Sequence, residues 1–177
     1  MIANDSGTVL RTPTAGVTGR ALETTAGIAA GLASQLATGN AVYQLPVQEV
    51  AFNTTTIVRL LEVNLSEQRL YLKENGAVVD SWLISSGLTF ATETGHYRIN
   101  AHVREQTMRG HNADGTTYET PNVEWVMYFN GDQAFHGVYW HSNWGHRMSH
   151  GCVGMPIYRA QQIYSWSAGG TDVWIHN

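Results

Sequence analysis

The chain has 177 residues, of which 43% are hydrophobic and only 14% charged, with a formal net charge of -4 at pH 7. This length suits one domain of ordinary size, and the composition excludes a disordered chain. This net negative charge gives no positive electrostatic field that would attract a polyanion, so we expect no nucleic-acid partner. No run of about 18 apolar residues occurs in it, so we expect no membrane-spanning segment.

The first fifty residues differ in composition from the rest. They are rich in Ala, Gly and Thr and contain no tryptophan. We therefore expect residues 1–50 to form an N-terminal appendage, whose role the residues do not indicate. Apolar residues four apart predict a helix from Thr25 to Thr38 that Gly39 ends. Neither a basic segment nor a continuous apolar segment follows Met1, so no signal peptide is visible in this chain.

From Thr56 the pattern changes to the period of two that is typical of strands. Asn75-Gly76 lies between two such segments and predicts a hairpin turn. Further strands are expected within 94–103 and 124–137. Short strands separated by turns predict an antiparallel sandwich or barrel. Residues 156–166 predict one amphipathic helix that starts after a proline, and residues 171–176 a last strand.

A polar, glycine-containing stretch from Arg104 to Asn122 separates two of these strands. Loops of this length inside a compact domain are usually functional or mobile. The sequence therefore predicts a long loop at 104–122 of one of these two kinds.

Cys152 is the only cysteine of the chain, so it has no partner for an intramolecular disulfide. A free cysteine is either a small buried hydrophobe or a reactive thiol. Nucleophilic chemistry needs an easily deprotonated thiol, a base held in place and donors for an oxyanion. The run Ser149-His150-Gly151-Cys152 offers several of these parts, because Gly151 allows a substrate to approach the main chain closely.

Four histidines near the thiol are candidates for the base. His136 ends a predicted strand, where a rigid element can hold an imidazole, and His141 is its main rival. His146 and His150 are better suited to structural or pocket roles. The same side chains suggest a zinc site, but neither Cys-x-x-Cys nor a helical His-Glu pattern occurs. We therefore expect neither a metal nor another cofactor.

The motifs "AFHG" and "SHGCV", with His136 sixteen positions before Cys152, resemble the L,D-transpeptidase catalytic domain, also called the YkuD domain. The likeness continues through "VNLSEQRLYLKENG", "TETGHYRI" and "PNVEWVMYF", and covers residues 56–177. It implies a mainly β sandwich or barrel, with one helix after the catalytic cysteine and a lid loop at 104–122.

The resemblance also implies roles for individual residues. Cys152 would be the nucleophile and His136 the base, oriented by the backbone carbonyl of Gly137. Ser149, His150 and Gly151 would shape the thiol turn, with backbone N–H groups at 151 and 152 forming the oxyanion hole. The expected substrate-binding residues are Met108, Arg109, Gly110, Tyr118, Trp125, His141, Trp144 and Arg147.

The implied reaction proceeds through a thioester on the thiol. The acyl donor and the acceptor are peptidoglycan stem peptides, and the product is a 3-3 cross-link. Such an enzyme works outside the cytoplasmic membrane and is a carbapenem target. Water in place of the amine would give a carboxypeptidase or endopeptidase. An aromatic-rich pocket without catalysis would give a cell-wall-binding module.

One position departs from the family pattern. The family usually has Asn or Arg two residues after the cysteine, and this chain has Gly154. Loss of the polar residue leaves Arg147, Arg109 or Arg159 as alternative sources of a cation.

Overall fold

A computed structural model describes residues 1–177 except 5, 13–19, 23–24, 40–46, 50–54 and 112–114. It divides into two compact units, one made of Met1–Thr12 with Thr56–Asn177 and the other of Pro13–Thr55. This division differs from the expected appendage at 1–50, because the first twelve residues belong to the larger unit. Strand β1 (Ile2–Ala3) pairs in parallel with β5 (Ile57–Asn64) and accounts for this difference.

In its described residues, the smaller unit contains one helix and a pair of short strands. Helix α1 (Thr25–Ala37) confirms the predicted helix, and Gly39 follows it with a φ of 76°. Strands β3 (Arg20–Leu22) and β4 (Val47–Glu49) pair antiparallel.

The larger unit is mainly β, as predicted, and contains a first sheet of seven strands. Strand β5 pairs antiparallel with β6 and parallel with β13, and β8 pairs with the other edge of β13. Besides β1 and β5, the strands are β2 (Val9–Arg11), β6 (Arg69–Glu74), β7 (Ala77–Leu83), β8 (Gly95–Arg98) and β13 (Asp172–His176).

The predicted hairpin turn at Asn75-Gly76 is confirmed between β6 and β7. Both residues have positive φ, 51° and 80°, which suits a two-residue turn of the kind that Asn-Gly favours. The side chain of Asn75 also accepts a hydrogen bond from the N–H of Val58 at 3.0 Å, so the turn is joined to β5.

The second sheet has the order β12-β11-β10-β9 and carries the motifs singled out above. Its strands are β9 (Ala101–His111), β10 (Thr117–Asn130), β11 (Gln133–Val138) and β12 (Val153–Pro156). The first three pair antiparallel in sequence order, whereas β11 and β12 run parallel.

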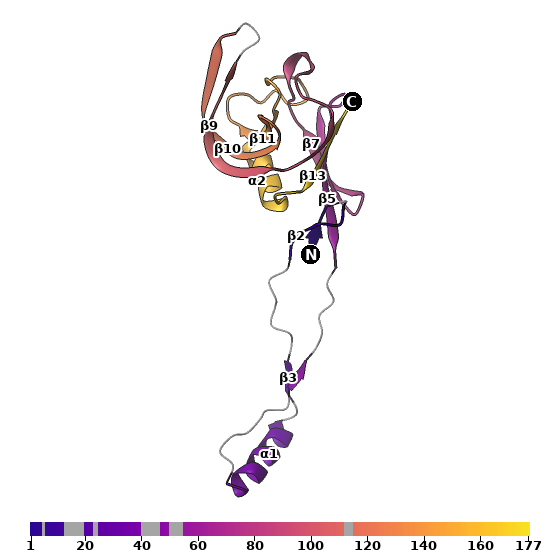
Figure 1. Ribbon diagram of the computed structural model, residues 1–177, viewed down its shortest axis with the longest axis vertical. Coiled ribbons are helices and arrows are strands. Elements are labelled where there is room, and N and C mark those ends of the chain that lie inside the picture. The colour runs from indigo at the N-terminus through magenta and orange to yellow at the C-terminus, as the bar shows by residue number, and fades with distance from the viewer. Residues whose placement is uncertain (5, 13–19, 23–24, 40–46, 50–54, 112–114) are drawn as a thin grey trace. The chain divides into compact units, whose positions relative to one another are not determined.

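The prediction of a loop from Arg104 to Asn122 is wrong for the described part of that segment. Strands β9 and β10 form a long curved hairpin there, as Figure 1 shows, and residues 112–114 lie outside the described residues. Polar residues and glycine do not prevent strand pairing here, and Pro121 and Asn122 fall at a register shift between Thr120 and Val123. Proline and positive φ are compatible with a strand at such a bulge.

The main core lies between the two sheets and under helix α2 (Ile157–Trp166), which matches the predicted helix after Pro156. Alternate residues of the strands supply it. Its fully buried members include Leu61, Val63, Leu70, Leu72, Met127, Phe135, Met155, Ile163 and Ile175. A short 3-10 helix (Leu88–Phe90) follows β7. Among the described residues, no helix has the length and apolar character that a membrane crossing requires.

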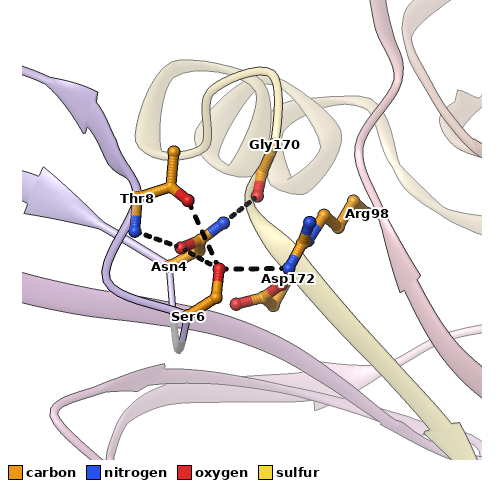
Figure 2. Close-up of polar contacts among 6 residues, drawn as sticks. All are labelled: Asn4, Ser6, Thr8, Arg98, Gly170 and Asp172. Atoms are coloured by element: carbon orange, nitrogen blue, oxygen red, sulfur yellow. Dashed lines mark hydrogen bonds and ion pairs between the residues drawn. The ribbon is translucent and has the colours of Figure 1, made fainter.

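Polar contacts hold the N-terminal segment to the first sheet. Asn4 is 2% exposed, and its Oδ1 accepts hydrogen bonds from the N–H of Thr8 and from the Ser6 hydroxyl, both at 2.8 Å. Its Nδ2 donates to the carbonyl of Gly170 at 3.4 Å. Figure 2 shows this network, which Arg98 extends from Ser6 to Asp172.

Candidate active site

Cys152 lies at one cavity of about 230 Å³, bounded by the second sheet and the segments around the thiol. The hairpin of β9 and β10 supplies one wall. Nine of the residues predicted from the sequence line this cavity, namely Met108, Gly110, Tyr118, His136, His141, Ser149, His150, Gly151 and Cys152.

The thiol of Cys152 directly precedes β12 and is largely enclosed. Its S–H donates a hydrogen bond to the carbonyl of Asp132 at 3.6 Å. Burial raises the pKa of Cys152 to about 11, although the backbone N–H of Ala134 opposes this by stabilising the thiolate. Cys152 is therefore a neutral thiol at neutral pH.

The turn before the thiol is held by the hydroxyl of Ser149. This hydroxyl donates to the carbonyl of Cys152 at 2.5 Å and accepts from the N–H of Gly151 at 3.2 Å. Gly151 has a φ of 149°, and the hydroxyl of Thr92 donates to its carbonyl at 2.8 Å. One expected oxyanion donor, the N–H of Gly151, is thus engaged inside the turn.

His136 is buried on β11, 3% exposed. Its Nδ1 lies 2.9 Å from the carbonyl of Gly137. A carbonyl can only accept, so the proton sits on Nδ1 and Nε2 of the neutral ring carries a lone pair. Burial lowers the pKa of His136, partly offset by this hydrogen bond. Gly137 itself leaves no room for a side chain, since an added Cβ would lie 3.2 Å from Cα of Ile157.

His141, the rival base, has the opposite arrangement. Its Nδ1 accepts a hydrogen bond from the N–H of Asn143 at 3.2 Å, which leaves the proton of the neutral ring on Nε2. Burial lowers its pKa as well. The imidazoles of His136 and His141, which both line the cavity, therefore differ in kind, because His136 has an acceptor at Nε2 and His141 a donor.

The hairpin contacts the thiol turn through two stacked rings. The ring of Tyr118 on β10 lies over that of His150, with centroids 4.3 Å apart and planes 12° apart. Gly110 on β9 allows this position of the tyrosine, since a Cβ there would lie 2.6 Å from the Tyr118 hydroxyl.

Several predicted substrate-binding residues have other surroundings. Arg109 pairs with Glu119 on the exposed face of the hairpin. Trp125 packs under Arg104, whose Cζ lies 3.4 Å from the ring centroid. Arg147 donates to the carbonyl of Gly87 at 3.4 Å. These three, together with Trp144, are not among the residues that line the cavity.

Position 154, the departure from the family pattern, lies in the cavity wall on β12. A Cβ there would be 2.7 Å from Cγ2 of Val138 and 3.3 Å from the hydroxyl oxygen of Ser85. Arg159, one suggested substitute cation, pairs instead with Asp80 at 2.7 Å. None of Arg109, Arg147 and Arg159 lines the cavity.

The sequence reasoning missed several lining residues, among them Ser85, Asp132, Gln133, Val138, Trp140 and Met148. The ring of Trp140 stacks on that of His136, with centroids 5.7 Å apart. For Ser85 no local pattern distinguishes it from its neighbour Ser86. In the part of the chain that the structure describes, no group of three or more His, Cys, Asp or Glu residues is arranged to hold a metal ion.

Residues 58–175 match the family model of the L,D-transpeptidase catalytic domain. The chain belongs to this family. None of the curated proteins compared with the chain matches it. Among solved structures, the catalytic domain of the E. faecium L,D-transpeptidase is 26% identical with a TM-score of 0.60, covering 67% of this chain and 96% of that one.

Two further neighbours carry bound drugs and share the fold. An LD transpeptidase in complex with imipenem is 17% identical with a TM-score of 0.61, covering 68% of this chain and 60% of that one. L,D-transpeptidase 3 from Mycobacterium tuberculosis, with a faropenem-derived adduct, is 18% identical with a TM-score of 0.61. This match covers 69% of this chain and 62% of that one. The chain thus spans less than two thirds of either of these two proteins.

Proposed function

We propose that this protein is a cysteine L,D-transpeptidase that forms 3-3 cross-links between peptidoglycan stem peptides. The observation that carries the proposal is the hydrogen bond from Nδ1 of His136 to the carbonyl of Gly137, in the cavity that also holds Cys152. It supports His136 as the base, because the fixed Nδ1 proton leaves Nε2 to accept one. Family membership supports the reaction type.

The first half of the reaction acylates the thiol. The S–H of Cys152 passes its proton to Nε2 of His136 as sulfur attacks the donor carbonyl, and His136 then protonates the departing D-Ala amine. A neutral thiol and a neutral imidazole suit this coupled transfer, since neither charged form is favoured by burial. The oxyanion is held by backbone donors of the turn, and we assign the N–H of Cys152 first, because that of Gly151 donates to Ser149.

The second half transfers the acyl group. His136 deprotonates the acceptor amine, nitrogen attacks the thioester carbon, and sulfur leaves as a thiolate that recovers the proton. His141 contributes a donor at Nε2 for a carbonyl or carboxylate of the substrate.

The hairpin of β9 and β10 takes the role that was expected of a lid loop. Met108, Gly110 and Tyr118 face the cavity from it and are the substrate contacts that we propose on this side. Arg109, Trp125, Trp144 and Arg147 are not among the proposed substrate contacts, because none of them lines the cavity.

The proposed substrates place the protein on the outer side of the cytoplasmic membrane. Stem peptides serve as both donor and acceptor, and the neighbours with imipenem and a faropenem-derived adduct support a carbapenem as a covalent probe of Cys152.

Incubation with a disaccharide tetrapeptide followed by mass spectrometry tests the proposal. We expect a cross-linked dimer, and a thioester on the peptide that contains Cys152. Cys152→Ala abolishes both, and His136→Asn lowers thioester formation by at least about a hundredfold. His146→Ala, at an exposed imidazole outside the cavity lining, serves as the matched control. Tripeptide alone would instead identify a carboxypeptidase, and retention of peptidoglycan without labelling would identify a binding module.

A further inference from the structure

Asp132 lines the cavity, and the proposed mechanism does not use its carboxylate. The residue directly precedes β11 and is exposed. No other Asp or Glu, and no Lys or Arg, lines the cavity in the part of the chain that the structure describes. None of the ion pairs between described residues includes Asp132. The cavity wall therefore carries one carboxylate that a positively charged ligand can reach.

The thiol of Cys152 lies between Asp132 and His136 along the direction of β11. Its Sγ is 3.6 Å from the carbonyl oxygen of Asp132. The parallel pairing of β11 with β12 places Cys152 level with Ala134. Asp132 is two residues before that position and His136 two residues after it, each roughly 7 Å away along an extended chain. The carboxylate and the proposed base therefore belong to opposite sides of the thiol.

The negative charge of Asp132 acts on two walls of the cavity. Burial is the main reason that the pKa of Cys152 is raised to about 11, and the charge of Asp132 contributes to the rise. Burial also raises the pKa of Tyr118 on β10, and the charges of Cys152 and Asp132 add to this effect. Charge interactions weaken with distance, so the carboxylate lies near both the thiol and the hairpin. A cation is favoured at this side of the thiol.

The proposed substrate carries a cation that matches this carboxylate. A 3-3 cross-link joins the carbonyl of one third stem residue to the side-chain amine of another, so the third residue is a diamino acid. Because donor and acceptor are stems of the same kind, the donor carries this amine as well, and an amine of this type is an ammonium group at neutral pH. The five bonds from Cα to nitrogen of a lysine side chain span roughly 6 Å when extended.

The acylation step determines which way this side chain points. His136 protonates the departing D-Ala nitrogen, so that nitrogen lies on the His136 side of the attacked carbon. The bond from the same carbon to Cα of the third residue diverges from it and points toward Asp132. An ammonium group roughly 6 Å beyond that Cα can reach a carboxylate whose residue is roughly 7 Å along the strand from the thiol.

We propose that Asp132 is a specificity-determining residue that binds the side-chain ammonium group of the donor's third residue, an inference that rests on the proposed transpeptidase function. The ion pair forms before sulfur attacks and persists in the thioester, and it breaks no covalent bond. It holds the donor carbonyl at the thiol with the leaving nitrogen near His136. The acceptor amine is a separate group, which approaches from the His136 side.

Two donors that differ in this ammonium group test the proposal with Asp132→Asn. One is a disaccharide tetrapeptide with L-lysine at its third position, and the other has L-norleucine there, which keeps the carbon chain without the amine. D-Ala release in the first turnover measures acylation of Cys152 by either donor. We expect the unsubstituted protein to react about fivefold or more faster with the lysine donor, and Asp132→Asn to lower this preference below about twofold.

Glu105→Gln is the matched control, because Glu105 is exposed on β9 and does not line the cavity. It removes the same charge and should keep the preference for lysine. Added salt should weaken that preference in the unsubstituted protein and not in Asp132→Asn, since salt screens exposed ion pairs. A carbapenem without an amine should label Cys152 in Asp132→Asn at least as fast as in the unsubstituted protein, because loss of the charge lowers the pKa of the thiol.

The remaining outcomes separate the inference from the proposed function. An unchanged preference for lysine in Asp132→Asn, or equal rates with both donors in the unsubstituted protein, would overturn the role of Asp132 alone. A parallel loss of carbapenem labelling and of reaction with both donors would make Asp132 a structural residue and overturn the inference. If the unsubstituted protein released no D-Ala from either donor, the proposed function would fall together with this inference.

Discussion

The ring of His150 stacks on the ring of Tyr118 with centroids 4.3 Å apart, and this contact joins the thiol turn to strand β10. Because the two residues come from different parts of the chain, the position of the hairpin and the shape of the turn are coupled. Such ring pairs contribute about 0.5–1.5 kcal/mol beyond the area that they bury.

Substitutions at Tyr118 test this coupling. Tyr118→Phe keeps the stacked ring, whereas Tyr118→Ala removes it, so we expect faster amide exchange in β9 and β10 only for the alanine variant. Carbapenem labelling of Cys152 should slow by about fivefold for the same variant, in proportion to roughly 1 kcal/mol of lost contact. Equal exchange rates in the two variants would show that the stack does not hold the hairpin.

The raised pKa of Cys152 predicts a slow reaction with simple alkylating agents. The thiolate is the nucleophile, and a pKa of about 11 leaves little of it at pH 8. We expect iodoacetamide to react about a hundred times more slowly than with an exposed cysteine, at a rate that rises with pH up to about 11. Protein unfolded in urea provides the fast reference. A rate that levels off below pH 8 would indicate a thiolate already formed in the free protein.

Burial of neutral His136 predicts a dependence of stability on pH. Its folded pKa lies below the ordinary value of 6.5, so the unfolded chain binds the proton more readily. The neutral ring of His136 therefore contributes fully to the free energy of unfolding above about pH 6.5, and this contribution is lost as the pH falls toward the folded pKa. We expect the free energy of unfolding to fall between pH 7 and pH 5, and His136→Asn to flatten part of this slope.

Urea titrations at several pH values measure that slope. His102 and His141, whose pKa values burial also lowers, keep some slope in the His136→Asn variant. An unaltered slope in His136→Asn would contradict the buried neutral state.

The packing at Gly154 predicts a stability cost for any side chain there. A Cβ would lie 2.7 Å from Cγ2 of Val138, so we expect Gly154→Ala to destabilise the protein by about 1–3 kcal/mol. Val138→Ala in the same chain should recover part of the loss, since it removes the clashing methyl groups. Gly169→Ala is the control, because a Cβ there meets nothing within 4 Å. Equal melting temperatures for the variants at 154 and 169 would contradict this account.

The pairing of β1 predicts that residues 13–55 can be removed from the larger unit. Ile2 pairs with both Arg11 and Ile57, so the two ends of the removed segment are about two strand spacings apart, roughly 10 Å. We expect a chain in which about six Gly and Ser residues replace 13–55 to fold and to label at Cys152 with a carbapenem. Circular dichroism and mass spectrometry check both results, and an unfolded product would show that Pro13–Thr55 is needed for the fold.

Local patterns in the sequence correctly predicted the elements whose formation depends on residues close together in the chain. The Asn75-Gly76 turn and the helix after Pro156 were both found, because turn residues and amphipathic spacing act over a few positions. The motifs around His136 and Cys152 also found the two central residues of the cavity. The hairpin at 104–122 was missed, because pairing between β9 and β10 outweighs the local preference of Pro121 and Asn122.

The predicted substrate contacts were also only partly right, because the local sequence does not determine where each side chain lies in the folded protein. Tyr118 and His141 line the cavity, whereas Arg109 and Trp125 engage Glu119 and Arg104 instead. The register decides which face of a bulged strand a side chain occupies, and a shift of one residue moves the side chain to the other face. Ser85 was missed because its place in the cavity wall depends on pairing with Gly154, which is far away in the sequence.

The position of β13 between β5 and β8 means that the first sheet closes only after Cys152 has been synthesised. Strand β13 pairs in parallel with β5, although more than one hundred residues separate the paired positions, and it follows Cys152 in the chain. The buried residues Val123, Val126 and Ala134, which pack against Cys152, belong to the second sheet and come before the cysteine in the chain. Among the described residues, these neighbours of the thiol are therefore synthesised before the strand that joins β5 to β8.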